Sequence, residues 1–219
     1  MLAGRTSVFI ADDHRLVRET VADHLAAAEG FVVVGSAASA EEAVLQAPRL
    51  SPDVVQMDID LGGSFGLDAA RRIGEMLPDA RLIFLSGFVY DRFIQSALEM
   101  GAAGYVSKHE GADVLVAAVR EVARGGRFFS QEVLRRLVIS RDGVSAGGVL
   151  QTRAAALTDR ERQVLSHVAH GLTKKDIADR LRLSVKTVER HCDKLMSKLD
   201  IHDRVGLTRY AIREGLTDL

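Results

Sequence analysis

Polar residues follow four short apolar runs in the first half of the chain, and their types suit phosphoryl chemistry. Asp12 and Asp13 follow SVFIA, Asp58 follows VVQM, Ser86 ends RLIFLS, and Lys108 follows GYVS. Three clustered carboxylates repel one another, and a hard cation such as Mg²⁺, which prefers oxygen ligands, would relieve that repulsion. Asp58 could then attack a phosphoryl group and form an acyl phosphate. Ser86 could hydrogen-bond the phosphoryl oxygens, and Lys108 could pair with their charge.

These side chains meet only if the apolar runs are neighbouring parallel strands. From residue 7 onward, β-rich runs alternate with helical stretches five times. Such alternation predicts a parallel sheet covered by helices on both faces. We predict an α/β doubly wound domain over residues 5–128, with a five-stranded parallel sheet in the flavodoxin-like order 2-1-3-4-5. In that order ligands bind at the carboxyl ends of the first and third strands.

The second half of the chain has a different pattern. Residues 140–156 lose periodicity and are rich in Gly, Ser and Ala, which is typical of a flexible connection. We therefore predict a linker over residues 129–156. Residues 157–219 contain four helical stretches and no strand pattern, which predicts a small all-α domain. Its segments Thr173–Leu181 and Val185–Leu199, with Ser184 as the N-cap between them, predict a helix-turn-helix suited to a DNA major groove.

Charge and composition narrow the class of protein. Residues 155–219 hold 13 Lys and Arg against 10 acids, a balance of +3, which leaves −4 for residues 1–154. This mild asymmetry fits a nucleic-acid-binding segment joined to an acidic domain. The single cysteine, Cys192, excludes an internal disulfide. No apolar run approaches the roughly 20 residues of a bilayer span, so we expect a cytoplasmic protein without membrane contact.

The first half resembles the receiver domain of two-component response regulators. The resemblance rests on DDH at 12–14, MDID at 57–60, LSG at 85–87 and GYVSK at 104–108. It implies that Asp58 is the phosphoacceptor, that Lys108 pairs with the phosphoryl charge, and that Ser86 and Tyr105 reorient together once Asp58 is phosphorylated. The resemblance also implies a Mg²⁺ site formed by Asp13, Asp58 and the backbone carbonyl of Asp60, with Asp12 assisting through water.

One departure from the receiver pattern concerns the loop after the acceptor. Leu61-Gly62 stands where the family commonly has Met-Pro, and the GGSFG that follows is looser than usual. A loop without that proline should be more mobile. We therefore expect an effect on phosphoryl lifetime and metal affinity, with the acceptor unchanged.

The second half resembles the LuxR-type helix-turn-helix of the NarL/FixJ group of response regulators. The matching segments are LTDRERQVL and GLTKKDIADRLRLSVKTVERH. The resemblance implies base reading by Glu189, Arg190 and Asp193, two of which are acidic where relatives often carry lysine. The lost phosphate attraction should lower nonspecific affinity. Outward positions predict further contacts, mainly to DNA phosphates, by Lys174, Lys175, Lys186, Thr187, Lys194 and Lys198.

Together the two resemblances imply a transcriptional regulator controlled by phosphorylation. A sensor histidine kinase would phosphorylate Asp58, and the phosphorylated protein would form a homodimer that binds a double-stranded DNA operator. Such a receiver accepts a phosphoryl group, and it could dephosphorylate itself, but it is not a conventional enzyme. In the unphosphorylated protein we expect the receiver to cover the recognition helix or to hold the two domains apart.

Two other functions stay open at this point. The altered loop at 62–66 would suit a DNA-binding regulator whose receiver does not use phosphate. DIDLGG also resembles the nucleophile motif of haloacid-dehalogenase-type phosphatases, in which Asp60 would be the general acid. Those enzymes carry their acidic metal-binding motif after the nucleophile strand, whereas the acidic pair here precedes it at 12–13.

Overall fold

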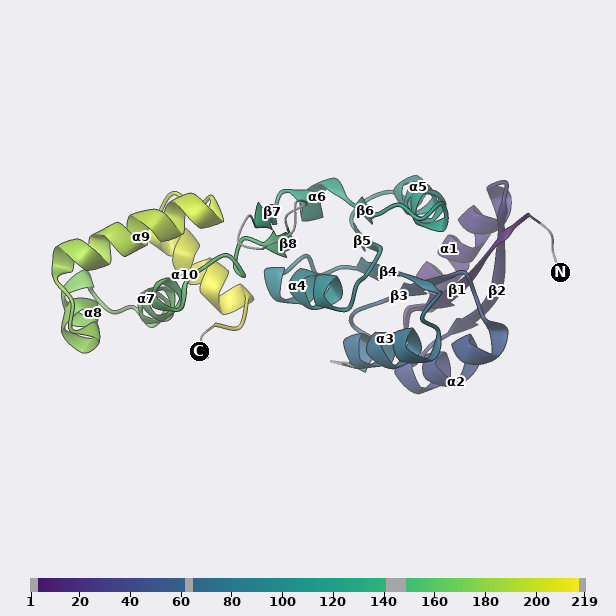
Figure 1. The fold of residues 1–219 in the computed structure, drawn as a ribbon, viewed down its shortest axis with the longest axis horizontal. Coiled ribbons are helices and arrows are strands. Elements are labelled where there is room, and N and C mark those ends of the chain that lie inside the picture. Colours follow the sequence, from purple (N-terminus) through teal and green to yellow (C-terminus); the bar gives the residue numbers. More distant parts are fainter. Residues whose placement is uncertain (1–3, 62–64, 141–148, 217–219) are drawn as a thin grey trace. The chain divides into compact units, whose positions relative to one another are not determined.

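The computed structural model describes residues 4–61, 65–140 and 149–216 of the chain (Figure 1). It forms two compact units. The first contains Met1–Val89 and Phe93–Arg135, and the second contains Tyr90–Arg92 and Arg136–Leu219. Within the described part of the chain, no helix combines the length and apolar character needed to cross a membrane.

The first unit is built on a parallel sheet with the strand order β2-β1-β3-β4-β5-β6. The predicted order of the first five strands is confirmed, and a sixth strand extends the sheet beyond β5. Its pairing brings Phe128 beside Gly104, where a Cβ atom would lie 2.9 Å from the Phe128 carbonyl oxygen. The six strands are β1 (Thr6–Ala11), β2 (Phe31–Ala37), β3 (Val54–Met57), β4 (Arg81–Ser86), β5 (Gly104–Ser107) and β6 (Phe128–Phe129).

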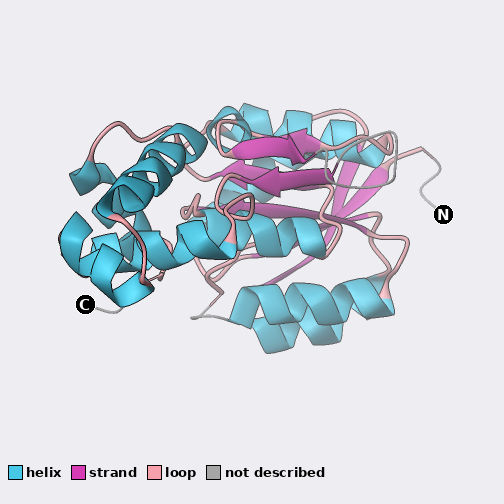
Figure 2. Cartoon of the chain, turned by 60° about the vertical axis from the view of Figure 1, so that its left-hand side comes forward, coloured by secondary structure: helices cyan, strands magenta, loops and turns pink. Residues whose placement is uncertain are grey.

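Helices cover both faces of this sheet, as the layered view in Figure 2 shows. One core joins apolar side chains of β1, β4 and β5 to those of α1 and α5, while α2 and α3 pack against each other. All four residues of β3 and of β5 are buried, as expected for strands covered on both faces. The helices are α1 (Arg15–Ala27), α2 (Ala40–Leu50), α3 (Phe65–Met76), α4 (Asp91–Glu99), α5 (Ala112–Ala123) and the single turn α6 (Gln131–Leu134).

The second unit contains the predicted four-helix domain and a hairpin that the sequence did not predict. Strands β7 (Leu137–Ser140) and β8 (Val149–Thr152) pair antiparallel. With α6 they lie within 129–156, the segment predicted as a linker, and β6 ends at its first residue. Residues 141–148 are outside the described part. The domain boundaries 5–128, 129–156 and 157–219 stay a prediction. The helices are α7 (Asp159–Ala169), α8 (Lys174–Leu181), α9 (Val185–Leu199) and α10 (Arg204–Arg213).

Local sequence explains how the helix-turn-helix is formed. Thr158 and Thr173 begin α7 and α8 with reciprocal capping boxes, which satisfy backbone N–H groups that a helix start leaves unpaired. Arg182, with a φ of 53°, ends α8 in the left-handed region, and the Ser184 side chain accepts from the Thr187 N–H at the start of α9. A buried core formed by α7 to α10 then fixes the angles between these helices.

Candidate functional site

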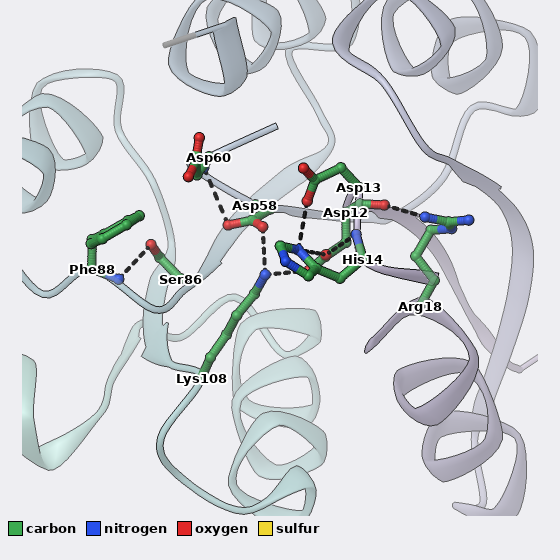
Figure 3. A network of polar contacts seen from close by, with 9 residues as sticks. All are labelled: Asp12, Asp13, His14, Arg18, Asp58, Asp60, Ser86, Phe88 and Lys108. Carbon is green, nitrogen blue, oxygen red and sulfur yellow. Dashed lines mark hydrogen bonds and ion pairs between the residues drawn. The ribbon is translucent and has the colours of Figure 1, made fainter. Parts of the chain in front are cut away.

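The carboxyl ends of four strands bring the predicted phosphoryl-chemistry residues together (Figure 3). Asp12 follows β1, Asp58 follows β3, Ser86 ends β4, and Lys108 follows β5. Backbone hydrogen bonds extend the ladder past the strand ends, because the Asp58 N–H donates to Ala11 O at 2.8 Å and the Lys108 N–H donates to Ser86 O at 2.8 Å. These residues therefore occupy positions fixed by the sheet.

A buried ion cluster occupies this edge of the sheet. The Lys108 Nζ lies 2.7 Å from Asp12 Oδ2 and also contacts Asp58 Oδ2. Asp12 is fully buried, and Asp58 is 2% exposed. Burial, with a smaller contribution from Asp12, raises the pKa of Asp58 to about 6 against the opposing effect of Lys108. Burial alone would lower the pKa of Lys108, but its two carboxylate partners outweigh this and raise it.

The residues present fit a divalent cation. Asp12, Asp13, His14 and Asp58 each offer one ligand atom, and these four atoms lie within 4.8 Å of one another. Lys108 pairs with two of the three carboxylates, those of Asp12 and Asp58, whereas the Asp13 carboxylate lies beside His14, so the cluster holds more carboxylates than ammonium groups. The Asp60 N–H donates to Asp58 Oδ1 at 3.3 Å, which places the Asp60 backbone beside the acceptor carboxylate. Most of these donors are oxygens, the ligands that hard cations prefer.

Ser86 and Tyr105 share one backbone partner. The Ser86 Oγ accepts from the Phe88 N–H at 3.0 Å, and the Tyr105 hydroxyl donates to the Phe88 carbonyl oxygen. Both side chains are fully buried, whereas Phe88 is 38% exposed. The two residues predicted to respond to phosphorylation are therefore connected through the loop after β4.

The second unit places the predicted DNA-contacting side chains on and around α9. The apolar face of α9 is buried. The exposed side chains among the predicted contacts include Lys175 on α8 and Lys186, Arg190, Asp193 and Lys194 on α9.

Four of the predicted contact residues, Lys174, Thr187, Glu189 and Lys198, have partners within the domain. Lys174 Nζ lies 3.1 Å from Glu189 Oε1, and both side chains are about half exposed. Lys198 Nζ lies 2.7 Å from Glu161 Oε2 and also donates to Ala156 O. Thr187 Oγ1 shares a 2.8 Å hydrogen bond with Ser184 Oγ. Contact of Lys174 or Lys198 with a DNA phosphate therefore requires an exchange of partners.

Comparison with known proteins identifies the family. The response regulator receiver domain family matches residues 8–120, and the luxR family of bacterial regulatory proteins matches residues 155–211. The chain is 36% identical over 211 residues to the response regulator GacA of Pseudomonas protegens, covering 96% of this chain and 97% of that relative. It is 32% identical over 209 residues to the response regulator protein VraR of Staphylococcus aureus, covering 95% and 97%.

This chain is a response regulator of the NarL/FixJ group. Its receiver and LuxR-type domains make it a DNA-binding transcriptional regulator. Among solved structures, the RcsB response regulator of Salmonella typhimurium has a TM-score of 0.71 at 23% identity, covering 95% of this chain and all of that chain. A LuxR-family response regulator from Aurantimonas has a TM-score of 0.57 at 32% identity, covering 60% and 94%.

Several residues at the response regulator's acidic site were not assigned from sequence. The His14 Nδ1 lies 2.6 Å from Asp13 Oδ1, and Arg18 donates to the Asp12 carbonyl oxygen at 2.6 Å. A Cβ atom at Gly66 would lie 2.4 Å from the Asp58 carbonyl oxygen, so α3 begins directly against the acceptor's backbone. The DDH motif contained the signal for His14. Gly66 ends the GGSFG loop that departs from the receiver pattern, of which residues 62–64 lie outside the described residues. Arg18 carries no such signal, because only the packing of α1 brings it to the site.

Proposed function

We propose that a sensor histidine kinase phosphorylates this response regulator on Asp58, and that phosphorylation promotes homodimerisation and operator binding. The observation that carries the proposal is the position of Asp58, a buried carboxylate in contact with Lys108 within a cluster that suits a cation. Attack by an Asp58 oxygen would form a new P–O bond while the bond between phosphorus and the donor's histidine nitrogen breaks. The kinase regains its histidine, and the receiver carries an acyl phosphate.

Each neighbouring side chain has a role in this step. Mg²⁺, when bound, would neutralise charge around the phosphoryl group, and we propose Asp13, Asp58 and the Asp60 carbonyl as its protein ligands, with Asp12 acting through water. The Lys108 ammonium already contacts Asp58, so it would pair with a phosphoryl oxygen after only a small displacement. Ser86 would exchange its bond from the Phe88 N–H for a bond donated to the phosphoryl group. Tyr105, held to the same residue, would reorient with it.

The proposed DNA contacts use α9 as the recognition helix in a major groove. Arg190 is exposed and could bond O6 and N7 of guanine, while Glu189 or Asp193 could accept from cytosine N4. Lys175 on α8 and Lys186 and Lys194 on α9 are also exposed and would contact phosphates. Support comes from the relatives: RcsB has been solved as a complex with DNA.

Dimerisation is the proposed switch because one small domain of modest charge binds DNA weakly. Two domains held together convert the second binding step into an intramolecular one, which raises affinity through effective concentration. An operator with two-fold symmetry would match such a pair. We further propose that the protein acts in the cytoplasm without membrane contact and that it is not a conventional enzyme.

Intact mass after incubation with Mg²⁺ and a small phosphodonor tests the acceptor assignment. We expect one phosphoryl adduct on the wild type and on Asp68→Ala, an exposed acid on α3 that serves as the matched control, and none on Asp58→Ala. An adduct that persists in Asp58→Ala would refute the assignment. A folded protein that binds Mg²⁺ without forming an adduct would instead favour a phosphate-independent regulator.

The switch is tested by footprinting on DNA fragments selected by the protein itself. We expect the phosphorylated protein to protect a two-fold site at a lower concentration than the unphosphorylated protein does. We also expect the form that protects the site to sediment as a dimer. Equal protection by both forms would refute control by phosphorylation and leave DNA binding intact.

A further inference from the structure

His14 lies at the acidic site, and its ring has no role in the proposed phosphoryl transfer. It is the N-cap residue of α1, but its side chain makes no capping hydrogen bond. Its backbone N–H donates to Asp12 Oδ1 at 2.9 Å. Its Nδ1 lies 2.6 Å from Asp13 Oδ1 and 3.5 Å from Asp12 Oδ1, so the ring faces the carboxylates (Figure 3).

The distances permit His14 to bind the same ion as the carboxylates. The four ligand atoms of Asp12, Asp13, His14 and Asp58 lie within 4.8 Å of one another. Bonds of about 2.0–2.4 Å from donors to one central ion allow donor separations up to about 4–4.8 Å. The four donor atoms are therefore close enough together to bind a single cation, and His14 supplies the one nitrogen among them.

Chemistry distinguishes this set from one made of oxygens alone. Mg²⁺ prefers oxygen donors, whereas imidazole nitrogen suits later first-row ions such as Co²⁺ and Ni²⁺. For a fixed set containing nitrogen, affinity rises from Mn²⁺ toward Cu²⁺. A histidine at the edge of a carboxylate cluster thus adds little to Mg²⁺ binding and much to the binding of these ions.

We propose that His14 is a direct metal ligand that makes the receiver site selective for transition ions such as Co²⁺ and Ni²⁺ as well as competent for Mg²⁺. This inference rests on the proposed metal site and extends it to a residue outside the set predicted from sequence. The His14 side chain is 65% exposed, so water can carry the Nδ1 proton away or move it to Nε2 as the metal binds. The ring then exchanges its bond to Asp13 for a bond to the ion.

Metal-binding measurements on the full chain test this inference. Calorimetry with Mg²⁺, Co²⁺ and Ni²⁺ would compare the wild type with His14→Gln and with His24→Gln. His24 is the matched control, since it is exposed on the same helix with its Nδ1 2.8 Å from Thr20 O, outside the cluster. We expect His14→Gln to weaken Co²⁺ and Ni²⁺ binding by about 10-fold or more, the scale on which even outer partners of metal ligands act, with Mg²⁺ binding unchanged.

Pulsed electron paramagnetic resonance of the protein loaded with one equivalent of Cu²⁺, the ion at the nitrogen-preferring end of the series, gives a direct readout of ligation. We expect coupling to the remote ¹⁴N of an imidazole ligand in the wild type and in His24→Gln that is lost in His14→Gln. A wild type without that coupling, or a ratio of Co²⁺ to Mg²⁺ affinity that His14→Gln leaves unchanged, would overturn the inference while the Mg²⁺ site stands. If Asp13→Asn binds Mg²⁺ as tightly as the wild type, the proposed metal site itself fails, and the role of His14 fails with it.

Discussion

Replacing Asp58 by an asparagine should stabilise the metal-free receiver at neutral pH, because the change removes a charge that the fold buries. Asp58 is 2% exposed, and its contact with Lys108 does not fully offset the loss of hydration and the repulsion from Asp12. The result is a pKa of about 6, against a usual value of 3.8. A group with this environment costs folding free energy whenever it is ionised.

The sign and size of the effect follow from linkage. Between these two pKa values the folded state holds more protons than the unfolded state, so stability falls as the pH rises from about 4 to about 6 and is level above that. At about 1.4 kcal/mol per pKa unit, the rise of the pKa of Asp58 corresponds to roughly 3 kcal/mol. The amide introduced by Asp58→Asn has no charge, but Lys108 then loses one carboxylate partner, so we expect a net gain of about 1–3 kcal/mol at pH 8 and little gain near pH 4.

The assay must report on the receiver alone, since two units can unfold separately. Hydrogen exchange of β1 and β3 peptides, measured by mass spectrometry in the full chain over a urea series, gives that free energy. A difference between wild type and Asp58→Asn that is the same at pH 4.5 and pH 8 would refute the reasoning. Saturating Mg²⁺ should also shrink the difference at pH 8, because a bound cation relieves the repulsion in the wild type only.

Three further changes test other parts of the molecule. Glu189→Gln should free Lys174 and tighten nonspecific DNA binding. Fluorescence anisotropy should show the slope of log binding constant against log salt concentration becoming steeper by about 0.9, the value for one added phosphate contact. An unchanged slope would mean that Lys174 stays off the DNA. Gly66→Ala should destabilise the receiver by about 1–3 kcal/mol and slow phosphorylation, because the new methyl group would meet the Asp58 carbonyl oxygen. Hydrogen exchange of β3 would measure the loss of stability, and intact mass over time would measure the rate of phosphorylation. Leu195→Ala, at a fully buried position of α9, should cost the second unit about 2–5 kcal/mol in urea unfolding, and a loss below about 1 kcal/mol would contradict its assignment to the core.

The arrangement of the acidic site was largely predictable because it depends on strands. The carboxyl end of each of four apolar runs carries or adjoins one site residue, namely Asp12, Asp58, Ser86 or Lys108. In a parallel sheet those ends meet at one edge, so sequence order was enough to bring the four together. The roles of these residues stay predictions, but the structure brings them together at one edge of the sheet, as the sequence pattern predicted.

Contacts made by backbone atoms or by distant helices were not predictable in the same way. The partner of Ser86 and Tyr105 is the backbone of Phe88, which side-chain chemistry does not reveal. Lys198 has an outward position by helical spacing, yet Glu161 of α7 binds it across 37 residues. Strand β6 is two residues long, which is too short to show an alternation of apolar and polar residues in the sequence.

The two hydrogen bonds to Phe88 have a consequence for the surface of the receiver. They hold the residue on both sides of its Cα, one through the N–H and one through the carbonyl oxygen, and so restrain both of its backbone dihedral angles. These angles set the direction of the Cα–Cβ bond of Phe88, and its ring is among the exposed large hydrophobic side chains of the unit. Two fully buried hydroxyl groups thus set the direction in which an exposed aromatic side chain leaves the backbone. An ¹⁹F label on that ring would report the state of the interior from outside, without any helix having to move.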